Sequence, residues 1–177
     1  MKEYSVTVAE LKTLCPALCA GDRVFLSGTV YTSRDAAHRR LFDLMENGET
    51  LPFSLENAVI YYAGPTPAPQ GLAIGSCGPT TSSRMDSYTP RLYDLGVIAT
   101  IGKGDRSDAV VQAIVRNKGV YLCATGGAGA LAAKHIAACE VIAFDDLGCE
   151  SVKKLTFCDF PLTVGIDCHG GNLFVRH

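Results

Sequence analysis

Short apolar runs alternate with helix-like segments through the second half of this chain. Residues 95–102 (LGVIATIG) and 120–125 (VYLCAT) are apolar, as buried strands are. Residues 107–119 (SDAVVQAIVRNKG) between them have the serine start and glycine stop of a helix. Strands joined through a helix of this length run parallel, so the alternation predicts an α/β protein with a mainly parallel sheet. We also expect a helix over 126–138 and strands over 139–146 and 153–170.

The first third of the chain is richer in strand signals. Residues 22–33 (DRVFLSGTVYTS) alternate apolar and polar side chains, which predicts a strand leading into a helix over 34–49. Ser33 or Asp35 could begin that helix. Residues 61–71 contain three prolines and two glycines, so we expect an irregular linker there. The β-rich part adds strands against or beside the parallel sheet.

Composition limits the classes of protein to which the chain can belong. A length of 177 residues suits one domain with a sizeable core, which we expect to span residues 1–177. Apolar residues make up 47% of the chain and charged residues 19%, which excludes a disordered chain. A net charge of −2 without a basic run argues against nucleic-acid and membrane partners. With no apolar leader at the N-terminus, we expect a cytoplasmic location.

The chain contains eight cysteines, and no two of them have C-x-x-C spacing. A zinc site or a ferredoxin-type cluster on this chain is therefore poorly supported. Cys123, Cys139 and Cys158 lie in apolar runs, where a reduced thiol packs as a small apolar group. We expect reduced thiols and no metal ligands.

Groups that favour anions follow three of the predicted strands. Arg34 follows the first strand, Lys103 follows the strand over 95–102, and Gly126 and Gly127 follow the next one. In open α/β sheets, ligands bind at the carboxyl ends of the strands. We therefore expect Arg34 and Lys103 to face one anion site.

Residues 77–90 (CGPTTSSRMDSYTP) gather many hydroxyl side chains around Arg84 and Asp86. An arginine fork matches a carboxylate through two hydrogen bonds, and threonine hydroxyls supply further donors. With Arg34 and Lys103 nearby, the site would hold up to three cations, enough to neutralise a dicarboxylate. The usual phosphate-binding motifs are missing.

Two further features have simpler explanations. Residues 126–132 (GGAGALA) fit only the looser form of a dinucleotide-binding motif, without an acidic residue in register for a ribose contact. They suit a tight strand-to-helix turn. His38 shares a helix face with Arg34, and we expect a structural histidine that helps to orient the site rather than a catalyst.

Five blocks, in order along nearly the whole chain, resemble the β subunit of the class I iron–sulfur-dependent hydro-lyases. This family contains fumarate hydratases and L(+)-tartrate dehydratases. The blocks are GTVYTSRDAAHRRL (28–41), GPTTSSRMDSYTP (78–90), IGKGD (101–105), ATGGAGALAAKHI (124–136) and DFPLTVGIDCHGGNLF (159–174). The second block, with RDAAH upstream, is the specific part of the match. Ser83 departs from it, because the family often has glycine there.

The resemblance implies a swivelling β/β/α domain of three layers. The domain would close over a [4Fe-4S] cluster held by a separate α subunit, in a dimer of αβ pairs. Arg34, Arg84 and Lys103 would bind the substrate carboxylates, and Thr80 and Thr81 would lie against the reacting carbon. Thr80 matches the residue favoured as catalytic base, which Lys103 would assist. The reaction would be the reversible hydration of fumarate to (S)-malate, with an open iron acting as Lewis acid on the hydroxyl.

Several alternatives stay open at this stage. The same motifs fit an L(+)-tartrate dehydratase β subunit, whose discriminating contacts could lie in the other subunit. A purely structural partner subunit needs neither Arg84 nor Lys103, and a stand-alone anion-binding module would bind dicarboxylates without any partner. Within the site we expect Asp86 to orient Arg84 and the proton-relay acid to come from the α subunit.

Overall fold

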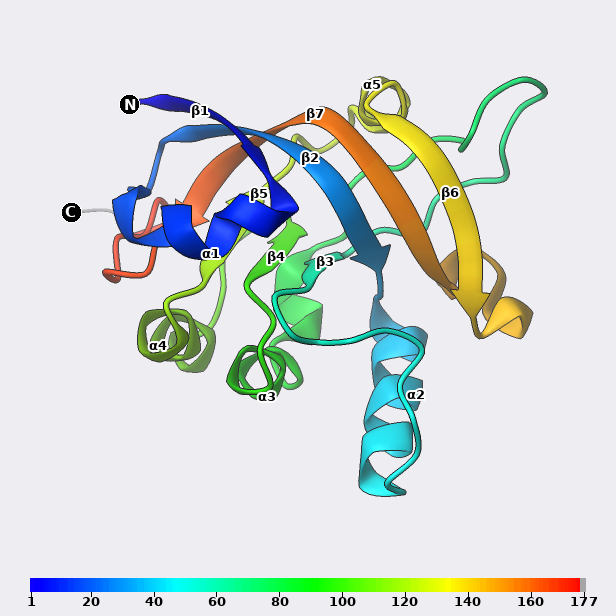
Figure 1. Cartoon of the computed structure of the whole chain (residues 1–177), viewed down its shortest axis with the longest axis horizontal. Coiled ribbons are helices and arrows are strands. Elements are labelled where there is room, and N and C mark those ends of the chain that lie inside the picture. The colour runs from blue at the N-terminus through cyan, green and yellow to red at the C-terminus, as the bar shows by residue number, and fades with distance from the viewer. Residues whose placement is uncertain (176–177) are drawn as a thin grey trace.

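The computed structural model describes residues 1–175, which form a mixed α/β fold around one strongly curved sheet (Figure 1). The strands are β1 (Glu3–Thr7), β2 (Arg23–Thr32), β3 (Val59–Tyr61), β4 (Ala99–Gly102), β5 (Val120–Cys123), β6 (Ile136–Ala143) and β7 (Val152–Ile166). The α-helices are α1 (Leu11–Leu14), α2 (Asp35–Glu46), α3 (Thr89–Asp94), α4 (Asp108–Asn117) and α5 (Gly129–Ala133). The 3-10 helices are η1 (Val8–Glu10), η2 (Cys15–Ala17), η3 (Ser82–Met85) and η4 (Asp145–Glu150).

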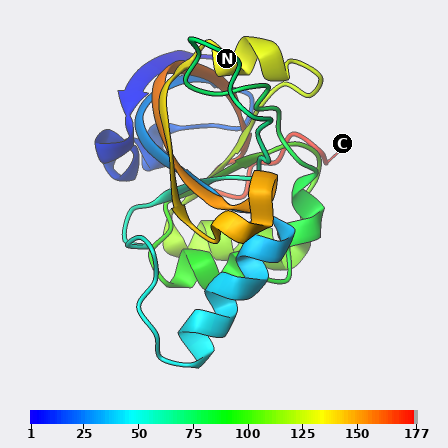
Figure 2. The same cartoon turned by 90° about the vertical axis from the view of Figure 1, so that its right-hand side faces the viewer.

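The sheet curls until β7 pairs with β2 and closes a barrel. Its strand order is β1-β2-β3-β4-β5-β7-β6, with the additional pairing β2–β7. Neighbours from β1 to β5 are parallel, whereas β7 runs antiparallel to β2, β5 and β6. Figure 2 shows the curved wall nearly end-on, with α2, α3 and α4 together on one side. The predicted mixed α/β fold with a mainly parallel sheet is confirmed.

After β5, the elements differ from the predicted alternation of strands and helices. The expected helix over 126–138 is wrong beyond Ala133, because α5 ends there and Ile136 already pairs with Phe157. Pairing with β7 buries Ile136 and outweighs the helix propensity of the neighbouring alanines. Only η4 joins β6 to β7, and this connection is too short for a parallel crossover.

Apolar side chains form three clusters that position the helices. The barrel interior contains Leu26, Leu122 and Phe157 among its fully buried residues. A second cluster joins α2 and α3 to the sheet, and a third joins α4 to β5. The helix expected over 107–119 is confirmed as α4, which ends at Lys118 in the left-handed conformation (φ 55°). No helix within residues 1–175 is long and apolar enough to cross a membrane.

Candidate functional site

The parallel strands β2 to β5 end at one edge of the barrel, and residues 77–86 cross that edge. We call this segment the crossing loop. The backbone N–H of Thr80 donates to Tyr62 O after β3 (2.6 Å), and that of Ser82 donates to Lys103 O after β4 (2.9 Å). The N–H of Cys77 donates to Gly129 O in α5 (3.1 Å). The crossing loop is therefore fixed to the residues just after β3 and β4 and to α5.

Arg34 and Arg84 meet at one carboxylate, that of Asp35. Arg84 donates from Nε to Oδ1 (3.0 Å) and from Nη2 to Oδ2 (2.7 Å). Arg34, just before α2, donates from Nε to Asp35 Oδ2 (3.2 Å) and lies 2.9 Å from Glu150 Oε1. The Arg84 side chain is 51% exposed and that of Arg34 is 23% exposed. Both side chains are thus partly exposed, Arg34 from the position just before α2 and Arg84 from η3.

Lys103 lies on the other side of the crossing loop. It pairs with Thr81 in an isolated parallel β-bridge. Its side chain lies along the turn after β5, because a Cβ built on Gly126 would be 3.4 Å from Lys103 Cδ and 3.9 Å from Nζ. Within the part of the chain that the structure describes, no carboxylate forms an ion pair with Lys103. The ammonium group therefore stays available to an anion.

The structure brings the predicted residues Arg34, Thr80, Thr81, Arg84 and Lys103 to the same edge of the barrel. Arg34 and Arg84 are paired with Asp35 and Glu150, whereas Lys103 forms no ion pair among the described residues. Arginine is suited to planar carboxylates and lysine to a point contact with either oxygen. The arrangement can bind a small carboxylate, and its exposed arginine leaves one side open to a second polypeptide.

The prediction that Asp86 orients Arg84 is wrong. Asp86 accepts from Arg106 Nε at Oδ1 (2.7 Å) and from the Ser107 N–H at Oδ2 (2.6 Å). The carboxylate that contacts Arg84 is that of Asp35. The sequence predicted Asp35 as a possible first residue of a helix, but not as a partner of Arg84. Asp86 instead ties the crossing loop to the start of α4.

Arg106 is a site-supporting residue that sequence reasoning missed. Its side chain is fully buried, with Nη2 donating to Thr89 Oγ1 (2.8 Å) and Nη1 to Thr100 Oγ1 (3.2 Å). The guanidinium carbon lies 5.3 Å from the ring centre of Tyr62 and 4.8 Å from that of Tyr121. The available signal was weak: Arg106 lies three residues after Lys103 in a glycine-containing loop, a position typical of exposed arginines.

His38 lies behind the site rather than in it. The side chain is fully buried, its Nδ1 is 2.8 Å from Ser33 Oγ, and its ring meets Tyr62 edge-on. Burial lowers the pKa of His38 to about 4, so the ring is neutral at pH 7. The hydrogen bond between this neutral ring and the Ser33 hydroxyl fixes the residue before Arg34. Among the described residues, Nε2 has no hydrogen-bond partner.

The cysteines do not form a cluster site. All eight are free thiols, and burial raises the pKa values of Cys15 and Cys77 to about 12. An iron–sulfur cluster needs thiolate ligands, and Cys15 and Cys77 are held as buried thiols. Residues 1–175 contain no group of three or more His, Cys, Asp or Glu side chains placed to hold a metal ion. The side chains that the structure describes therefore do not provide the grouped ligands that a [4Fe-4S] cluster needs.

Several known proteins are similar in sequence to this chain over most of its length. The chain is 42% identical to "Fumarate hydratase 2" of Leishmania major and 41% identical to "Fumarate hydratase class I, aerobic" of Escherichia coli, over 88% and 86% of its length. It is 33% identical to "L(+)-tartrate dehydratase subunit beta" of Escherichia coli, over 89% of its length and 79% of that subunit.

The lengths of these relatives differ. The chain spans only 28% of the two fumarate hydratases, but most of the tartrate dehydratase subunit. The family described as "Fumarase C-terminus" matches residues 2–177. This chain belongs to the Fumarase C-terminus family.

Proposed function

We propose that this chain is the β subunit of a class I fumarate hydratase, which hydrates fumarate reversibly to (S)-malate. The observation that carries the proposal is the convergence of Arg34, Arg84 and Lys103 with two threonines at one barrel edge. Family membership and identity above 40% to two fumarate hydratases support the reaction class.

We assign each of these residues a role that follows from its chemistry. We assign Arg34, Arg84 and Lys103 to the two substrate carboxylates, where they also stabilise charge that builds up beside the reacting carbon. Thr80 is the catalytic base and Thr81 contacts the substrate beside it. A threonine hydroxyl is a weak base unless a cation stabilises its deprotonated form. We assign that charge to Lys103, whose backbone pairs with that of Thr81, the residue next to Thr80.

The remaining parts of the enzyme lie outside this chain. Because these residues do not fit a [4Fe-4S] cluster, we propose that a partner α subunit holds it and supplies the Lewis-acid chemistry of this enzyme class. We propose a dimer of αβ pairs and a three-layer swivelling β/β/α domain over residues 1–177. The free thiols favour a reducing compartment, and we propose the cytoplasm.

The test is Arg84→Ala in the complex purified anaerobically from the native cell. Loss of a charged donor at the substrate lowers kcat/KM for fumarate by about 10²–10³-fold. Because Arg84 is half exposed, the stability of the fold changes by less than about 1 kcal/mol. Near-normal turnover by the variant would refute the assignment and favour a purely structural subunit.

L(+)-tartrate is the second candidate substrate. The observation that favours it is length, because the chain matches most of a separate tartrate dehydratase β subunit. Assaying the same complex with fumarate, (S)-malate and L(+)-tartrate compares kcat/KM values directly. A higher value for tartrate would replace fumarate in the proposal.

A further inference from the structure

One carboxylate, Asp35, contacts both arginines of the candidate site. Its two oxygens accept from Nε and Nη2 of Arg84, and Oδ2 also lies 3.2 Å from Nε of Arg34. The two arginines come from segments 50 residues apart in sequence. Asp35 is therefore the direct polar link between the start of α2 and the crossing loop at this site.

The edge of Arg84 that Asp35 occupies decides which donors are left for a ligand. A guanidinium group has five N–H donors, and Asp35 uses one on Nε and one on Nη2. Nη1 and the second hydrogen of Nη2 point away from this contact. They form the terminal edge, which can still bind a second carboxylate through two hydrogen bonds.

Local structure holds Asp35 in place. It is the first residue of the 12-residue helix α2, where the free N–H groups and the helix dipole favour a negative side chain. Its side chain is 30% exposed, so the carboxylate is partly shielded from solvent. Glu150 Oε1 also lies near Nε of Arg34, at 2.9 Å, so this one N–H faces two carboxylates.

We propose that Asp35 is a positioning residue that holds Arg34 and Arg84 as one unit, with the terminal edge of Arg84 presented to a substrate carboxylate. The identity of the substrate rests on the proposed function. The positioning of Arg34 and Arg84 by Asp35 does not. If Asp35 served only to reduce positive charge, its removal would strengthen the binding of a dianion. If it positions the arginines, its removal weakens that binding.

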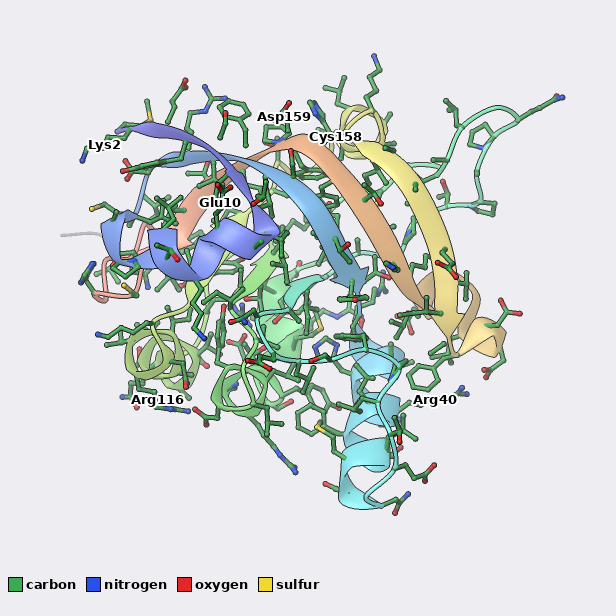
Figure 3. The ribbon with its side chains drawn as sticks, viewed as in Figure 1. Lys2, Glu10, Arg40, Arg116, Cys158 and Asp159 are labelled. Atoms are coloured by element: carbon green, nitrogen blue, oxygen red, sulfur yellow. The ribbon has the colours of Figure 1, made fainter. Side chains whose placement is uncertain are left out.

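The first experiment measures steady-state kinetics of the native complex carrying Asp35→Asn. We expect KM for fumarate to rise at least tenfold, with a smaller change in kcat. Asp35→Glu keeps the charge and should restore part of the affinity. Asp94→Asn is the matched control, because Asp94 accepts from Nε and Nη2 of Arg116 at 2.8 Å each and lies away from the site. Figure 3 labels Arg116 beside α4.

The second experiment needs no turnover and uses the isolated full chain. Heteronuclear NOE values of the arginine ¹⁵Nε–H groups report their order on the picosecond–nanosecond timescale. We expect the values for both Arg34 and Arg84 to fall in Asp35→Asn, while Asp94→Asn changes only Arg116. Unchanged values for Arg34 and Arg84 would overturn the inference.

The two experiments separate the failure of each proposal. A wild-type complex that turns over neither fumarate nor tartrate refutes the proposed function, and the NMR result still decides the role of Asp35. An active wild-type complex whose Asp35→Asn variant has an unchanged or lower KM refutes the positioning role alone.

Discussion

Gly64 leaves the space through which Arg34 reaches the site. A Cβ built on Gly64 would lie 2.9 Å from Arg34 Nη1 and 3.4 Å from Cδ, and 3.3 Å from the carbonyl oxygen of Cys149. The nearest of these atoms is the end of a flexible side chain. An added methyl group therefore moves the arginine rather than the backbone.

We predict that Gly64→Ala raises KM for the dicarboxylate roughly tenfold, equivalent to about 1.4 kcal/mol. Its free energy of unfolding should change by less than about 1 kcal/mol, because the clash is relieved by moving a side chain. The check is a double-mutant cycle with Arg34→Ala. If Gly64→Ala weakens binding just as much in the Arg34→Ala background, the effect does not pass through Arg34.

A buried neutral histidine makes stability depend on pH. Burial lowers the pKa of folded His38 from 6.5 to about 4, so the unfolded chain binds a proton first as the pH falls. The stabilisation is complete above pH 6.5 and is lost progressively down to about pH 4. A shift of this size corresponds to about 3 kcal/mol.

Urea unfolding of wild type and His38→Gln at pH 7 and pH 4.5 tests this prediction. Carboxylates titrate in both proteins, so the difference between the two isolates the histidine. We expect wild type to lose more stability than the variant over this interval. Equal losses would show that His38 becomes protonated in the folded protein without cost.

At the scale of elements, Arg106 joins parts that do not follow one another in sequence. It contacts Thr100 in β4, Thr89 at the start of α3 and Asp86 at the end of η3. Breaking a buried ion pair from one side leaves an uncompensated charge, at a cost of about 3–5 kcal/mol. The helix that carries Arg84 thus depends on an arginine outside the crossing loop.

We predict that Arg106→Met lowers the free energy of unfolding by about 3–5 kcal/mol, measured by urea unfolding at pH 7. Arg116→Met is the control, since its pair with Asp94 is about half exposed and contributes about 1 kcal/mol or less. Similar small losses for both variants would mean that the buried pair contributes no more than a surface pair.

At the scale of the whole molecule, elements with a clear local pattern could be predicted. The strand β2 and the helices α2 and α4 lie where apolar periodicity and end signals placed them. The strand β3 was missed, because it has three buried residues and ends at Tyr61, the first residue of the expected linker. The helix α3 begins at Thr89, inside the hydroxyl-rich residues 77–90, where no helix was predicted.

The part of the site that lies directly after the parallel strands could be predicted. Arg34 and Lys103 were expected at one edge because each follows a parallel strand. The partners of the arginines could not be predicted, because Asp86 is two residues from Arg84 in sequence whereas Asp35 is 49 residues away. Tertiary placement alone decides that Asp86 pairs with Arg106 instead.

The closure of the barrel has a consequence for how the protein is made. Arg23 in β2 pairs with Thr163 in β7, 140 residues later. At about 5–20 residues per second, a ribosome takes roughly 7–28 s to add that stretch. During this interval one side of β2 has no β7 to pair with, and an open strand edge invites pairing with other chains. The unpaired side of β2 therefore makes the nascent chain prone to aggregation until β7 has been synthesised.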